Sequence, residues 1–187
     1  MREIEVKLQF PDKTINEVLA ELTDIRWSDP VAQEDSVYVA QERLGHKVKP
    51  GDRICRLRKE TKGNKTELTW TMKVQQQSSL DSEEHETTIG DLEAPAAMLR
   101  QFGFTDFVHV YKQRRKAVAS PYNLCLDYVH HLGVFIEIEY LTNEDVDSTE
   151  IQEKMYDWAR AQGLGNYVVN TTPYDTQIHE YEKSKEV

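Results

Sequence analysis

Apolar and polar side chains alternate with period two along most of this chain. The alternation covers eight segments, residues 3–10, 36–41, 53–60, 66–75, 83–89, 108–118, 123–129 and 134–141. Such alternation predicts strands with one apolar and one polar face. Turn sequences such as Lys62-Gly63-Asn64 separate the segments, so most connections are expected to be hairpins. A mainly antiparallel sheet follows, and closing it into a barrel would remove its exposed edges.

Three segments have helical periodicity instead. One begins near Thr14, which opens a capping-box sequence, a second follows Asp91 and ends at Gly103, and a third follows Ser148. No low-complexity tract or Gly/Ser linker divides the chain. We therefore expect a single α+β domain over residues 1–187, in which the helices pack on one side of the sheet.

The polar faces of the predicted strands carry like charges two residues apart. Residues two apart share a face of a strand, so these charges are neighbours. The acidic pairs are Glu3 with Glu5, Glu84 with Glu86 and Glu137 with Glu139, and the basic sets are Arg56 with Arg58 and Lys112 with Arg114 and Lys116. For any single strand, a solvated face with cross-strand ion pairs is the ordinary interpretation.

Taken together, the charged faces favour a binding site over a solvated surface. Like charges packed this closely need a counter-charge. Paired carboxylates suit hard divalent cations and arginine forks suit phosphate oxygens, so a metal-bound polyphosphate satisfies both. The net charge of −10 argues against a broad attraction to nucleic acid or anionic lipid. Neither is expected as a partner, and a polyanion would be held locally.

Other features indicate a cytoplasmic protein without a membrane partner. No apolar run approaches the length of a membrane span, and the first ten residues alternate instead of forming a signal-peptide core. Cys55 and Cys125 fit no zinc-binding spacing and are expected to be reduced packing residues. The six histidines are scattered, so a histidine metal site is not expected.

The order of the charged motifs resembles a known family. Glu3-x-Glu5-x-Lys7 is followed by Arg56-x-Arg58, Lys73, Lys112-x-Arg114 and the stretch LDYVHHLGVFIEIE, which ends at Glu139. This combination resembles the CYTH superfamily of triphosphate tunnel metalloenzymes, which contains class IV adenylate cyclases and thiamine triphosphatases. The resemblance spans nearly the whole chain. It implies an eight-stranded antiparallel β barrel, the triphosphate tunnel, with charged residues inside and helices packed outside.

The same resemblance implies roles for individual residues and a small-molecule triphosphate as the substrate. Mg²⁺ or Mn²⁺ would be bound by Glu3, Glu5, Asp127, Glu137 and Glu139. Phosphates would be held by Lys7, Arg56, Arg58, Lys73, Lys112 and Arg114, and the catalytic residues would be Lys7, Glu5 and Glu137. The roles of Glu84 and Glu86, and the choice between monomer and homodimer, stay open.

Two reactions fit this lining. In a cyclase the 3′-hydroxyl of ATP attacks the α-phosphorus and expels pyrophosphate, whereas in a triphosphatase water attacks the terminal phosphorus of tripolyphosphate or thiamine triphosphate. Chain length and the stretch LDYVHHLGVFIEIE resemble the cyclase branch, which we favour. Against it, many class IV cyclases carry a short His-Phe-containing extension before this motif, whereas two residues precede Glu3 in the sequence. A non-catalytic polyphosphate or nucleotide binding module and an inert salt-bridged barrel are the remaining alternatives.

Overall fold

The structure is a computed structural model that describes residues 1–44, 46 and 49–185. Its elements, in chain order, are β1 (Arg2–Phe10), α1 (Ile15–Glu21), β2 (Val31–Ala40), the short 3₁₀ helix η1 (Gln41–Arg43), β3 (Arg53–Lys62), β4 (Lys65–Gln75), β5 (Asp81–Thr88), α2 (Glu93–Gln101), β6 (Phe104–Ala119), β7 (Tyr122–Val129), β8 (Gly133–Thr142), α3 (Ser148–Ala161), β9 (Val168–Val169) and α4 (Tyr174–Lys183). No helix in this described part of the chain combines the length and the apolar composition that a membrane crossing requires.

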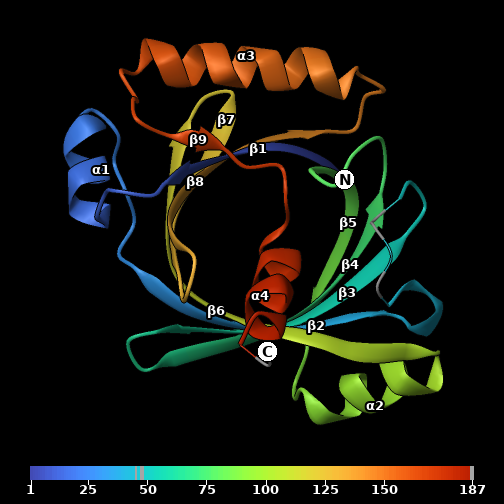
Figure 1. The fold of residues 1–187 in the computed structure, drawn as a ribbon. Helices are drawn as coiled ribbons and strands as arrows, with labels where there is room; N and C mark the ends of the chain where they lie inside the picture. Colours follow the sequence, from blue (N-terminus) through green and yellow to red (C-terminus); the bar gives the residue numbers. More distant parts are fainter. Residues whose placement is uncertain (45, 47–48, 186–187) are drawn as a thin grey trace.

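Strands β1 to β8 close into an antiparallel barrel (Figure 1). Their order around the barrel is β1-β8-β7-β6-β2-β3-β4-β5, and β5 pairs back with β1. The closing seam is short, because only Arg2–Ile4 of β1 pair with residues of β5. Further along β1, Leu8 and Gln9 pair with β9. The predicted α+β architecture, an eight-stranded barrel with helices outside, is confirmed.

Short hairpins set the register that keeps the charged residues on one face. Gly63, in the turn between β3 and β4, has a φ of 57°, a left-handed conformation that glycine adopts without strain. The register then places Arg56 opposite Thr71 and Arg58 opposite Thr69. A slip of one residue would move every side chain of a strand to the other face of the sheet.

Two apolar cores lie on the outer face of the barrel, beneath helices α1, α2 and α3. The largest packs α1 and α3 against β1, β7 and β8, where Ile4, Leu8 and Met155 are fully buried. Another places Leu99 of α2 beside Leu57 of β3. Because the apolar faces are covered from outside, the charged faces are left to line the interior.

Helix α4 is an element that the sequence analysis does not predict. It follows Pro173, and its two buried residues, Tyr174 and Ile178, pack against inward-facing apolar residues that include Val37 and Phe135. Figure 1 shows α4 in front of the barrel interior. Two buried residues in ten give little helical periodicity, so only the packing identifies this helix.

Strand β2 also differs from the prediction, because it begins at Val31 and not near residue 36. Its first half places Gln33 and Asp35 on the buried inner face. Buried polar residues break the apolar alternation on which the prediction depended. The consequence is that Asp35 was missed as a residue of the charged interior.

Candidate active site

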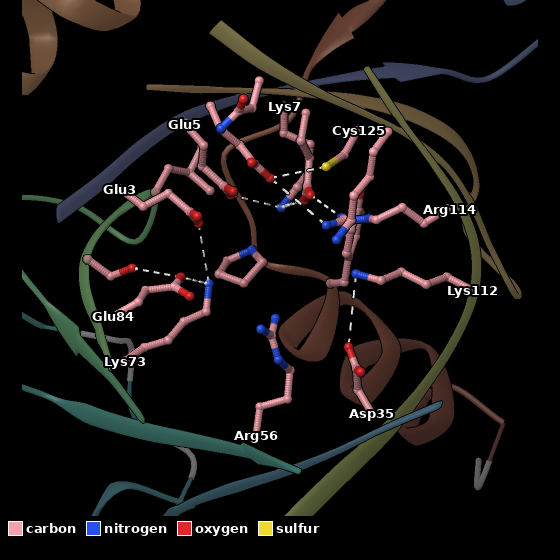
Figure 2. A pocket seen from close by; sticks show the side chains of 18 of the residues that line it. Glu3, Glu5, Lys7, Asp35, Arg56, Lys73, Glu84, Lys112, Arg114 and Cys125 are labelled. Atoms are coloured by element: carbon pink, nitrogen blue, oxygen red, sulfur yellow. Dashed lines mark hydrogen bonds and ion pairs between the residues drawn. The ribbon is translucent and has the colours of Figure 1, made fainter. Parts of the chain in front are cut away.

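A cavity of about 1100 Å³ occupies the barrel interior. All the predicted site residues except Asp127 line it, and Glu84 and Glu86 line it as well. Figure 2 shows labelled side chains from several strands pointing into this space. The cavity reaches solvent where the exposed residues Met1, Val118 and Leu141 line it. In the opposite direction it is lined by Tyr174 of α4.

Glu3, Glu5 and Glu139 form an acidic cluster beside the β1–β8 pairing. One carboxylate oxygen from each lies within 4.8 Å of those of the other two, and Glu5 is directly opposite Glu139 in the register. Burial, reinforced by the charge of Glu137, raises the pKa of Glu5 to about 7. Burial likewise raises the pKa values of Glu3 and Glu139. Each glutamate has one cation between 3.5 and 3.9 Å away, namely Lys73, Lys7 and Arg114, but these do not offset burial. The three oxygens fit a hard divalent cation.

The other acids predicted as metal ligands are neutralised by arginine. Arg114 Nε and Nη2 donate to the two carboxylate oxygens of Asp127 at 2.7 and 2.6 Å, and Nη2 also donates to Glu137. Burial alone would raise the pKa of Glu137, but Arg114 and then Lys7 hold it well below the usual value. The structure thus divides the five predicted metal ligands into two groups. Three form the acidic cluster, and the other two, Asp127 and Glu137, are held by Arg114. Of this pair, Asp127 lies behind the cavity wall.

A second buried ion pair involves Asp35, which sequence reasoning missed. Arg58 Nε and Nη2 donate to its carboxylate at 2.6 and 2.7 Å. Lys112 Nζ lies 3.9 Å from Asp35 and 4.0 Å from Asp127. Burial and the nearby charge of Arg114 lower the pKa of Lys112 to about 8. The sequence did contain a signal for this residue, because Asp35 lies two residues after Gln33 and shares its face of the strand. Recognising that signal required β2 to begin at Val31.

The deep end of the cavity, which we define as Lys7, Lys112 and Tyr174, lies against α4. Lys7 Nζ is 3.5 Å from Glu5 and 3.3 Å from Glu137, and it stands 4.2 Å from the centre of the Tyr174 ring. Lys112 Nζ stands 5.1 Å from the same ring. Tyr174 therefore contributes a cation–π contact to two predicted phosphate ligands from an element that was not predicted.

Lys73 and Arg56 occupy the wall formed by β3, β4 and β5. Lys73 pairs with Glu84 and lies 3.7 Å from Glu3. Burial would raise the pKa of Glu84, but Lys73 and Arg56 lower it to about 2. Arg56 makes looser contacts, donating to Thr71 at 3.2 Å and lying 3.5 Å from Glu86. Glu84, whose role the sequence left open, is therefore an ion-pair partner of Lys73.

The two cysteines occupy different environments. Both are free and buried. Cys55 packs in the apolar core beneath α2, as predicted. Cys125 instead lines the cavity and donates from Sγ to Glu139 Oε1 at 3.3 Å, and burial raises the pKa of its thiol. The thiol therefore supports a member of the acidic cluster while staying protonated.

Comparisons with known proteins agree with this geometry. The adenylate cyclase CyaB of Aeromonas hydrophila is 25% identical over 88 residues, which are 47% of this chain and only 46% of that protein. The PH1819 protein of Pyrococcus horikoshii has a TM-score of 0.76 at 25% identity, with 96% of this chain and 99% of that one covered. HpAC1 of Hippeastrum, which has a dominant triphosphatase activity, has a TM-score of 0.65 at 15% identity, with 97% and 96% covered. The CYTH domain model matches residues 1–167, so the chain belongs to the CYTH domain family.

Proposed function

We propose that this protein is a divalent-metal-dependent enzyme that acts on a small-molecule triphosphate, and that it converts ATP to cyclic AMP and pyrophosphate. The observation that carries the proposal is the order of charges along the cavity. The acidic cluster lies nearer solvent than the basic deep end, and this order orients a phosphate chain.

The exposed fractions of the deep lysines and of the acidic cluster follow that order, with Glu137 and Asp35 held in ion pairs at the deep end. Lys7 and Lys112 are 2% and 4% exposed beside Tyr174, whereas Glu3, Glu5 and Glu139 are 19%, 13% and 14% exposed. A triphosphate that enters with its terminal phosphate first would place its outer phosphates among the lysines. Its α-phosphorus would then lie at the acidic cluster. A cyclase reacts at the α-phosphorus, so this position of the acidic cluster suits it. A triphosphatase reacts at the terminal phosphorus, and with the substrate in this orientation it would need its acidic cluster at the deep end.

The chain's own residues would position and neutralise the reacting groups. Lys7, Lys112 and Arg58 would hold the departing pyrophosphate, whose charge grows as the bond to the α-phosphorus breaks. Arg56 makes only loose contacts and is free to turn toward a phosphate oxygen. A divalent cation held by Glu3, Glu5 and Glu139 would neutralise phosphate charge and lower the pKa of the attacking hydroxyl.

Phosphorus NMR of the protein with ATP and Mn²⁺ tests the reaction. We expect signals of cyclic AMP and pyrophosphate, with tripolyphosphate acting as an inhibitor. Formation of ADP and orthophosphate, or faster cleavage of tripolyphosphate than of ATP, would reject the cyclase in favour of a triphosphatase. That second reaction is supported by the fold shared with HpAC1. Tight phosphate binding without any product would indicate a binding module.

A further inference from the structure

Three side chains at the solvent side of the cavity have no part in the reaction proposed above. Arg26, Trp27 and Lys116, which we call the β6 rim, all line the cavity. Arg26 and Lys116 are exposed, and Trp27 is half-buried. Within the described part of the chain, neither cation forms an ion pair. Among the same residues, the buried indole Nε1–H of Trp27 has no hydrogen-bond acceptor.

Hydrogen bonds between Ser28 and residues at the end of β6 hold the rim in place. Ser28 N donates to the Lys116 carbonyl at 2.8 Å, and Lys116 N donates to Ser28 Oγ at 2.9 Å. Arg115 Nη1 donates to the Ser28 carbonyl at 3.0 Å. The indole of Trp27 packs in addition against the large apolar core. The segment that carries Arg26 and Trp27 is therefore fixed beside Lys116 before any ligand binds.

We propose that the β6 rim binds the planar base of a nucleoside triphosphate and so selects nucleotides over inorganic tripolyphosphate. This inference rests on the proposed function, because phosphates held at the deep end leave the organic end of the substrate toward solvent. Bases stack on aromatic side chains and on arginine planes, and Trp27 and Arg26 supply both kinds of group at the rim. Inorganic tripolyphosphate has no planar base to stack on the rim.

Trp27→Leu tests this inference by binding, independently of turnover. Calorimetry with Mn²⁺ should show the Kd of ATP rising roughly tenfold, as the loss of one stacking contact implies, and the Kd of tripolyphosphate changing less than twofold. Trp70→Leu is the matched control. Trp70 is also half-buried, but it packs beneath α2 outside the cavity. It should leave the ratio of the two Kd values unchanged.

Two outcomes would overturn the rim proposal: an unchanged Kd of ATP in Trp27→Leu, or equal weakening of ATP and tripolyphosphate. Equal weakening would mean that Trp27 only supports the barrel wall. A failure of the proposed reaction can be distinguished from a failure of the rim proposal. If the wild-type protein forms no cyclic AMP, while ATP binding stays selectively sensitive to Trp27→Leu, the rim is supported and only the cyclase reaction is rejected.

Discussion

Individual acidic residues in the barrel differ in whether a basic residue compensates them. Asp35 and Asp127 each receive a two-pronged arginine contact, and their charges stay within the protein's own network. Glu3, Glu5 and Glu139 stand close together, and burial raises their pKa values. The aspartates paired with arginine stabilise the barrel lining, whereas the clustered glutamates are suited to bind an added cation.

Glu139→Gln is expected to abolish turnover without unfolding the protein, because it removes charge from the acidic cluster and leaves volume unchanged. Mn²⁺ binding measured by calorimetry should weaken at least tenfold. Glu34→Gln, an exposed position paired with Lys59 outside the cavity, provides the control. A folded Glu139→Gln protein with the wild-type rate would remove Glu139 from the metal site.

Two of the three arginines predicted to bind phosphate, Arg56 and Arg114, should respond differently to truncation. Arg56→Ala removes loose contacts and should weaken triphosphate binding with little loss of stability. Arg114→Ala removes both short hydrogen bonds to the buried Asp127, leaving only Lys112 at 4.0 Å, and should lower the free energy of unfolding by about 3–5 kcal/mol. Urea denaturation and calorimetry on both variants separate the two effects. Equal stabilities of the two variants would contradict this assignment.

The acidic cluster should also make metal binding depend on pH. With a folded-state pKa of about 7 against an ordinary value of 4.5, Glu5 contributes stability that is full below about pH 4.5 and is lost as pH rises through 7. Without metal, the melting temperature should therefore fall between pH 5 and 8. Mn²⁺ displaces the proton, so its stabilising effect should grow over the same range. Glu5→Gln should reduce both slopes, and unchanged slopes would show that Glu5 keeps an ordinary pKa.

At the scale of elements, α4 covers apolar residues on the inner face of the barrel. Its residues Tyr174 and Ile178 are buried against inward-facing apolar side chains, and Tyr174 also contacts the deep lysines. Ile178→Ala is expected to cost about 2–4 kcal/mol of unfolding free energy, because it leaves a void in this contact. Glu182→Ala, exposed on the same helix, should change it by less than about 0.5 kcal/mol. Similar urea midpoints for the two variants would mean that α4 does not pack as described.

At the scale of the whole molecule, the barrel depends on a short closing seam between β1 and β5. Arg2 Nε and Nη2 donate to the fully buried Asp81 at 2.8 Å each, directly beside this seam. Arg2→Met should lower the free energy of unfolding by roughly 3 kcal/mol, because the Asp81 charge loses its partner. Lys59→Met breaks an exposed pair and should cost less than about 1 kcal/mol. Faster amide exchange in residues 2–4 of the Arg2 variant would locate the loss of stability at the seam. A free energy of unfolding equal to that of Lys59→Met would contradict this prediction.

The alternation of side chains predicted an antiparallel sheet and which charges of each predicted strand share a face, because the direction of a side chain along a strand is a local property of the backbone. The closed barrel with those charges inside was implied by the resemblance to the CYTH superfamily. Which acid meets which base was decided only by the tertiary structure. Asp35 and Arg58 are far apart in sequence and are joined by the register of β2 and β3, and Asp127 is held by Arg114 across β6 and β7. Helix α4 likewise depends on a surface that exists only once the barrel has closed. Pairing and closure are long-range contacts, and a pattern read along one strand does not contain them.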